Sequence, residues 1–133
     1  MVQEFSVSTR ERTQFINIDS DVQRIISDSG VSDGVCVVYV PHTTAAVTIN
    51  ENADPDVVRD IIMEAGKIVP FSDGYRHMEG NAAAHIKSSM IGASETVIIR
   101  DGRPAFGTWQ SLFFCEFDGP RSRRVLVQVI GKQ

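Results

Sequence analysis

Residues 95–131, ETVIIRDGRPAFGTWQSLFFCEFDGPRSRRVLVQVIG, carry the strongest structural signal in the chain. Runs of β-branched and aromatic residues alternate here with two turn dipeptides, Asp101-Gly102 and Gly119-Pro120. Such runs favour strands, and such dipeptides favour hairpin turns. The segment therefore predicts a series of short antiparallel strands connected by hairpins.

Strand patterns also occupy the first part of the chain. Residues 4–9 (EFSVST) and 13–18 (TQFINI) both alternate with period two, and their proximity predicts a hairpin. Residues 34–40 (GVCVVYV) predict a central strand buried on both faces, which Pro41 ends. Residues 45–50 (AAVTIN) alternate again and predict a further strand.

Helices are expected between the two blocks of strands. Asp19 or Ser20 can cap a helix through residues 22–29, with Gly30 at its C-terminal end. Asp54 and Pro55 are a strong helix start. The second helix carries an apolar stripe, expected in the core, of Val57, Val58, Ile61, Ile62 and Ala65. After a loop over residues 70–80, a third helix should begin near residue 81.

This arrangement predicts an α+β fold in which mostly antiparallel strands form a β-sandwich-like core with two to three helices. The chain has 133 residues and no internal repeat or Gly/Ser-rich linker. A single domain spanning residues 1–133 is therefore expected.

Composition excludes several classes of protein. The net charge of -4 opposes non-specific binding to nucleic acid, which requires many Lys and Arg contacts to phosphates. No segment has the roughly 20 apolar residues that span a bilayer, and the N-terminus lacks a signal-peptide pattern, so a cytoplasmic protein without membrane contact is expected. Cys36 and Cys115 both lie in apolar runs, which favours buried free thiols.

The three histidines lie outside the apolar runs. Imidazole is a common ligand of transition metals, and a catalytic zinc site typically takes three protein ligands. His42, His77 and His85 could therefore form a metal site, although their spacing matches no known metalloprotein signature. Alternatively, they are hydrogen-bonded histidines on the surface.

Carboxylates at Glu51, Glu79, Glu116 and Asp118 could assist such a site as ligands or general bases. Glu116 lies within the apolar run LFFCEF, where an unpaired charge would be costly to bury. A metal, a histidine or Arg121 could be its partner. An ordinary ion pair or an outward-facing strand position is the alternative.

Several further side chains suit a phosphorylated ligand. Thr43, Thr44 and Asn50 can exchange hydrogen bonds with it, whereas Lys87, Arg103 and Arg121 can complement its charge. No nucleotide-binding glycine motif and no activated nucleophile is apparent, so covalent catalysis is not expected. Trp109 is expected in the core or a subunit interface, with ligand stacking as the alternative.

Three motifs together resemble the YjbQ-like family. They are HTTAAVTINENADPD (42–56), GNAAAHIK (80–87) and GTWQSLFFCEFDGPR (107–121), and the resemblance runs essentially from end to end. It implies a compact α+β fold, a homotrimer and a metal site built largely from histidines. It also implies a secondary thiamine-phosphate synthase activity, which joins hydroxymethylpyrimidine diphosphate to thiazole phosphate and releases pyrophosphate.

Carried onto this sequence, the resemblance makes His42, His77 and His85 the expected ligands of a divalent metal. Zinc is expected, with magnesium possible for the diphosphate substrate. Glu51, Glu116 and Arg121 become the expected catalytic residues, and Asn50 joins them in the pocket.

Two other functions remain open. One is a metal-dependent hydrolase of a phosphorylated or amide substrate, with Glu116 or Glu79 as the base. The other is a trimeric module that binds a small phosphorylated metabolite without converting it.

Overall fold

The computed structural model describes residues 1–133 and contains three helices and eight strands. Their bounds, in chain order, are β1 Val2–Ser8, β2 Gln14–Asn17, α1 Asp19–Ser29, β3 Asp33–Tyr39, β4 Ala45–Glu51, α2 Pro55–Ile68, α3 Ala82–Ile91, β5 Ser94–Arg100, β6 Arg103–Pro104, β7 Gln110–Glu116 and β8 Ser122–Lys132.

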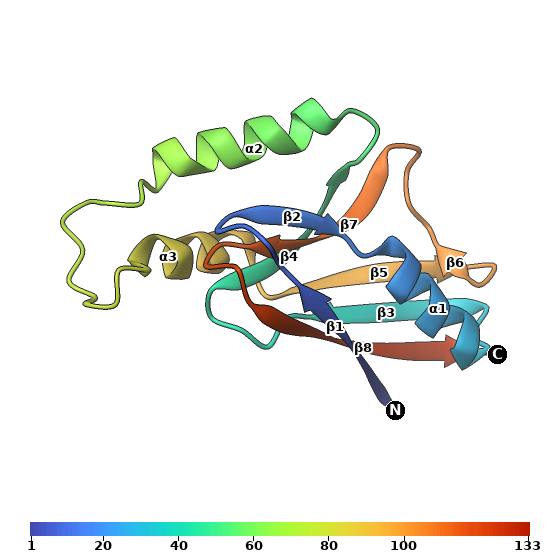
Figure 1. Cartoon of the computed structure of the whole chain (residues 1–133). Helices are drawn as coiled ribbons and strands as arrows, with labels where there is room; N and C mark the ends of the chain where they lie inside the picture. Colours follow the sequence, from blue (N-terminus) through green and yellow to red (C-terminus); the bar gives the residue numbers. More distant parts are fainter.

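The strands form two sheets within one α+β domain (Figure 1). The five-stranded sheet has the order β1-β8-β3-β5-β6, and the three-stranded sheet has the order β2-β7-β4. All pairings are antiparallel. The predicted fold class and the sandwich-like core are therefore confirmed.

Two predicted hairpins are wrong. β1 pairs with β8 and β2 pairs with β7, so the chain passes from one sheet to the other between residues 9 and 13. At Gly119-Pro120 the chain passes back, from β7 to β8. Period-two alternation identifies a strand but not its partner. Only the turn at Asp101-Gly102 closes a hairpin, between β5 and β6.

The strand that is buried on both faces is β7, not β3 as predicted. In β3, Cys36 and Val38 are buried, but Tyr39 on the opposite face is 45% exposed. Every residue of β7 from Ser111 to Glu116 is buried. The reason is that β7 is the middle strand of the smaller sheet, which has a hydrophobic cluster on each side.

The larger cluster lies between the two sheets and includes the inner side of α1, from which it takes Val22, Ile25 and Ile26. The smaller cluster covers the other face of the three-stranded sheet. It joins Phe113 and Cys115 of β7 to Ala84 of α3. α3 is thus fixed against β4 and β7, and this contact positions the chemistry described below.

The helices span nearly the predicted residues, but some of their predicted contacts are absent. Gly30 ends α1 in the left-handed conformation, as expected. Asp19 does not cap α1; its carboxylate accepts a hydrogen bond from the Leu112 N–H at 2.8 Å and so ties the helix to β7. Asp54 caps α2 by accepting from the Asp56 N–H at 2.9 Å.

The apolar stripe of α2 is not in the core, contrary to the prediction. No residue of this helix is buried, and only Val58 packs against the smaller cluster. The physical reason is that α2 makes few contacts with the rest of the chain, and its C-terminal half leaves a small apolar gap beside α3, lined by Ala65, Ile68, Met90 and Ile91.

Both cysteines are buried and free, as predicted. Burial raises the pKa of the Cys36 thiol to about 11 and raises that of Cys115 further, so neither is a reactive thiolate at neutral pH. None of the three helices is both long and apolar enough to span a membrane.

A close approach of β3 and β8 provides the first test. Gly34 lies opposite Gly131, and a Cβ at position 34 would lie 2.7 Å from the Gly131 Cα and closer still to the Ile130 carbonyl oxygen. We expect Gly34→Ala to lower the free energy of unfolding by about 1–3 kcal/mol, measured by urea denaturation.

Gly66→Ala is the matched control, because a Cβ there would meet nothing within 4 Å. Gly66 lies inside α2, where alanine should stabilise the protein by about 0.5–1 kcal/mol. An equal effect of the two substitutions would refute the close β3–β8 contact.

Candidate functional site

Three loops meet at one end of the molecule and enclose a cleft of about 460 Å³. They are the β3–β4 loop, the α2–α3 loop and the β7–β8 loop. In this cleft, here called the histidine cleft, every lining residue except Pro41 has a polar or charged side chain. The lining residues are Pro41, His42, Thr43, Thr44, His77, Glu79, Asn81, His85, Asp118, Arg121 and Arg123.

The β3–β4 loop is held in place from two sides. The Ser88 hydroxyl of α3 donates to the Thr43 carbonyl oxygen at 2.6 Å. The Arg123 guanidinium donates to the Thr44 hydroxyl at 2.8 Å. Thr44 is consequently buried, so its side chain supports the loop and has little surface left for a ligand.

His77 and His85 come together although they are eight residues apart. His77 lies in the loop before α3, and His85 lies in the first turns of that helix. Their ring centroids are 5.1 Å apart with an interplanar angle of 83°. The edge-to-face pair places two imidazole rings on one wall of the cleft.

His42 is engaged by the backbone on the opposite side. Its Nε2 atom accepts a hydrogen bond from the Arg124 N–H at 3.0 Å, which requires a lone pair on Nε2. Burial, followed by the charge of Arg123, lowers the pKa of His42. His42 is therefore a neutral ring whose proton resides on Nδ1.

These contacts do not fit the predicted three-histidine metal site. No group of three or more His, Cys, Asp or Glu side chains lies close enough to hold a metal ion. The Nε2 lone pair of His42 is already used by the backbone, and the neutral Nδ1 carries the proton. His77 and His85 alone are a pair of donors, fewer than the three protein ligands of a typical zinc site.

Glu116 and Arg123 form a buried ion pair beneath the cleft. Both Arg123 Nε and a terminal nitrogen donate to the carboxylate, which is completely buried. The Thr9 hydroxyl donates to Glu116 Oε1 at 2.8 Å, and the Asp118 N–H donates to Oε2 at 2.9 Å. Glu116 therefore holds neighbouring groups in position and does not line the cleft.

The carboxylate of Glu116 remains charged in this environment. Burial alone would raise its pKa, but hydrogen bonds from Arg123, the Asp118 N–H and Thr9 outweigh burial and lower the pKa below the usual value. The sequence indicated that Glu116 needs a partner and suggested a metal, a histidine or Arg121, whereas the partner is Arg123. Arg123 lies on the same face of β8 as the buried Val125 and Val127. This alternation in the sequence could have identified Arg123 as a buried residue.

Arg121 lies on the cleft and is anchored to Asp118. Its Nε donates to the Asp118 carbonyl oxygen at 2.8 Å, and a terminal nitrogen donates to the carboxylate at 2.9 Å. Burial alone would raise the pKa of Asp118, but hydrogen bonds from Asn81 and Arg121 outweigh it and lower the pKa. The second terminal nitrogen of Arg121 makes no hydrogen bond within the chain.

Several predicted site residues lie elsewhere. Glu51 and Asn50 are at the far end of β4, roughly 20 Å from Thr44 at about 3.3 Å per residue. Arg103 is on the edge strand β6. Lys87 lines a separate pocket on the other side of α3.

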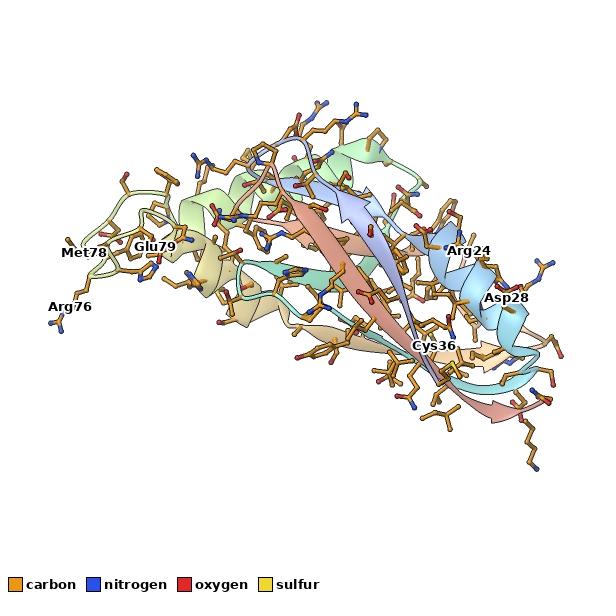
Figure 2. All side chains as sticks on the ribbon, turned by 60° about the horizontal axis from the view of Figure 1, so that its bottom comes forward. Arg24, Asp28, Cys36, Arg76, Met78 and Glu79 are labelled. Carbon is orange, nitrogen blue, oxygen red and sulfur yellow. The ribbon has the colours of Figure 1, made fainter.

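Trp109 is 63% exposed, so it is not in the core of this chain. Glu79 borders the cleft from the loop before α3. Figure 2 shows Glu79 together with Arg76 and Met78 where this loop projects from one end of the molecule.

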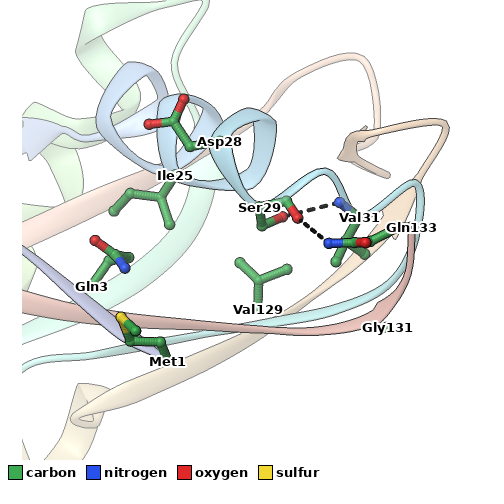
Figure 3. Close-up of a pocket in the computed structure, with 9 residues that line it drawn as sticks. All are labelled: Met1, Gln3, Ile25, Asp28, Ser29, Val31, Val129, Gly131 and Gln133. Atoms are coloured by element: carbon green, nitrogen blue, oxygen red, sulfur yellow. Dashed lines mark hydrogen bonds between the residues drawn. The ribbon is translucent and has the colours of Figure 1, made fainter.

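A larger hollow is at the other end and has different chemistry (Figure 3). It measures about 590 Å³ and lies between α1 and the ends of β1 and β8. Asp28 is the only charged side chain in its lining, and Gln133 bridges it by donating to the Ser29 carbonyl oxygen at 3.0 Å. The histidine cleft, not this hollow, collects the groups that can perform acid–base chemistry.

The buried ion pair can be tested directly. We expect Glu116→Gln to lower the free energy of unfolding by about 3–5 kcal/mol, because it leaves the buried Arg123 without a counter-charge. Urea denaturation measures this loss. Glu4→Gln is the control, since the Glu4–Arg124 pair is exposed at 3.6 Å and should change stability by less than about 1 kcal/mol. Equal losses in the two variants would contradict the described pair.

The lowered pKa of His42 makes the stability of the protein depend on pH. A folded-state pKa below the unfolded value of about 6.5 means that His42 contributes stability above that pH and loses the contribution as the pH falls through the folded value. NMR titration of the three imidazoles should show one ring, lost in His42→Gln, that titrates below about 6.5. Titration of this ring at or above the ordinary value would contradict the described burial of His42 beside the charge of Arg123.

Comparison with known proteins yields a consistent result. The family model described as "UPF0047 protein YjbQ-like" matches residues 3–132. UPF0047 protein MJ1081 of Methanocaldococcus jannaschii is 50% identical over 131 residues, which cover 98% of this chain and 95% of the relative. UPF0047 protein YugU of Bacillus subtilis is 45% identical over 132 residues, covering 98% and 100%.

Solved structures agree with these matches. A crystal structure of an uncharacterized YjbQ/UPF0047 protein from Clostridium acetobutylicum has a TM-score of 0.95 at 52% identity, covering 96% of this chain and 99% of that one. A hypothetical protein from Aeropyrum pernix has a TM-score of 0.94 at 36% identity, covering 99% of both chains. The chain belongs to the YjbQ-like UPF0047 family.

Proposed function

We propose that this protein is an enzyme that acts on a small phosphorylated metabolite in the histidine cleft. The observation that carries the proposal is the edge-to-face pair of His77 and His85 on the wall of a largely polar cleft that also contains Arg121. Imidazoles can transfer protons near neutral pH, and a guanidinium can bind phosphate oxygens.

The internal ion pairs of the cleft cancel in charge, so an anion would be held there by the remaining hydrogen-bond donors, opposite the unpaired carboxylate of Glu79. Glu116 neutralises Arg123 below the cleft, and the Asp118 carboxylate is engaged by Asn81 and Arg121. A terminal nitrogen of Arg121 still has donors to offer a phosphate. The Thr43 side chain and the Nδ1–H of the neutral His42 add uncharged donors nearby.

The specific reaction that we propose is of the thiamine-phosphate synthase type. Hydroxymethylpyrimidine diphosphate would lose pyrophosphate while the thiazole nitrogen forms the new carbon–nitrogen bond. The protein then needs to stabilise and protonate a leaving diphosphate but needs no side-chain nucleophile. Arg121 would bind the leaving group, and His77 or His85 would supply a proton.

The proposed reaction uses no metal bound by the protein, because the three histidines do not form a three-ligand site in the chain. Magnesium would arrive with the diphosphate as part of the substrate. Zinc binding by the three histidines stays a separate prediction, and it would require His42 to give up the hydrogen bond from the Arg124 N–H.

A homotrimer is part of the proposal and has support from the outer face of the five-stranded sheet. Val35, Ile98 and Ile130 stand side by side in one row of that face, and the last two are 61% and 56% exposed. Burial of this row by neighbouring copies would remove apolar surface from water. Glu51, Asn50 and Arg103 could act only in a site to which another copy contributes.

The hydrolase and the non-catalytic module predict different products. A hydrolase would release inorganic phosphate, but Glu116 has no free oxygen to serve as its base, which leaves Glu79. A binding module would be stabilised against heat by the ligand without forming a product.

The test incubates the protein with hydroxymethylpyrimidine diphosphate, thiazole phosphate and magnesium, and measures pyrophosphate and thiamine phosphate by chromatography. We expect turnover in the wild type and a loss of at least about 100-fold in kcat/KM for His85→Ala and Arg121→Met. Lys132→Met, a change at an exposed position, should retain full activity. Release of inorganic phosphate, or ligand-dependent thermal stabilisation without product, would reject the synthase and identify one of the two alternatives.

A further inference from the structure

A second, smaller compartment lies on the other side of Asn81 and Asp118 from the histidine cleft. It has a volume of about 210 Å³ and is here called the Lys87 pocket. It lies between α3, the end of α2 and the segment that joins β1 to β2. The residues that matter for its chemistry are Arg12, Phe71, Asn81, Lys87, Phe117 and Asp118.

Two cations border this pocket without a carboxylate partner. The Arg12 guanidinium carbon lies 4.5 Å from the centre of the Phe71 ring, and Lys87 Nζ lies 5.8 Å from the centre of the Phe117 ring. Neither takes part in any of the five ion pairs of the chain. Aromatic faces hold the cations in place but do not neutralise them.

Lys87 is half-buried in this position, and burial lowers its pKa. An ammonium that is partly removed from water and has no counter-charge gains from a bound anion more than an exposed lysine does. The remaining wall near Lys87 is formed by small residues, Gly66, Ala83 and Ala84, which leave space for a compact group.

The Asn81 side chain gives a second, independent reason to expect a ligand. Its Nδ2 donates to Asp118 Oδ2 at 2.9 Å, and this bond fixes the orientation of the amide, because the reverse orientation would place two acceptors together. Its Oδ1 is then a buried acceptor that receives no hydrogen bond. A buried polar atom without a partner is costly, and a ligand O–H or N–H would remove that cost once a shift of the Asn81 side chain opens Oδ1 to the pocket.

We propose that the Lys87 pocket is a second phosphate subsite, which holds the phosphate of a second substrate close to Lys87 and Arg12. This inference rests on the proposed function and assigns the second substrate of that reaction to a place in the fold. The Asn81–Asp118 pair forms the common wall, because both residues line both spaces. Only the phosphate of the second substrate would occupy the Lys87 pocket, and the rest of that molecule would extend past this pair to the histidine cleft, where the two substrates would be held as a positioned pair.

The test is calorimetric titration of inorganic phosphate into the full-length protein. We expect two sites per chain in the wild type. Lys87→Met keeps the length of the side chain but removes its charge, and it should weaken one site by about 10-fold or more. Arg12→Gln should weaken the same site, and it provides the test if Lys87→Met does not fold. Lys132→Met, at an exposed position, should leave both sites intact.

Arg121→Met separates this inference from the proposed function. A site that is lost in Lys87→Met and Arg12→Gln but retained in Arg121→Met supports the Lys87 pocket even if the histidine cleft binds no phosphate. Phosphate binding that depends on Arg121 and is unchanged in both Lys87→Met and Arg12→Gln overturns the inference and leaves the proposed function standing. Absence of binding in the wild type overturns both.

Discussion

The buried ion pair of Glu116 and Arg123 is the interaction on which the rest of the structure depends. It joins β7 of one sheet to β8 of the other, and Thr9 and Thr44 complete its hydrogen bonds from two further segments. A charge at this depth is tolerated only when its partners are in place. The pair therefore fixes four parts of the chain relative to one another, and the loops that leave this point form the histidine cleft.

The histidine cleft and the Lys87 pocket differ in how firmly the Glu116–Arg123 pair holds their walls. The histidine cleft lies directly over the ion pair, so its β3–β4 and β7–β8 walls are rigidly supported. The Lys87 pocket lies beside the loosely packed α2, none of whose residues is buried. A shift of α2 would change the Lys87 pocket without disturbing the histidine cleft, because Asp118 is held by Glu116 of β7 and by Arg121, and Asn81 is held by Asp118.

The sequence was sufficient to predict most elements but few of their partners. Alternation and capping residues are local signals, and they predicted the strands and the helix starting at Pro55. Whether β1 pairs with β2 or β8 depends on the whole core, which no local pattern contains. The same limit applies to the site: the three histidines do line one cleft, but the bond from the Arg124 N–H to His42 is visible only in three dimensions.

The burial of β7 on both faces also has a consequence for how the chain folds. Both neighbours of β7, β2 and β4, are synthesised earlier, and β1 likewise precedes its partner β8. Thr9 must find Glu116 across 107 positions of sequence. Pairings between such distant segments slow folding, because loop closure precedes the contacts that stabilise it. During synthesis, the N-terminal strands therefore remain without partners until β7 and β8 emerge, and their apolar faces are open to aggregation for that interval.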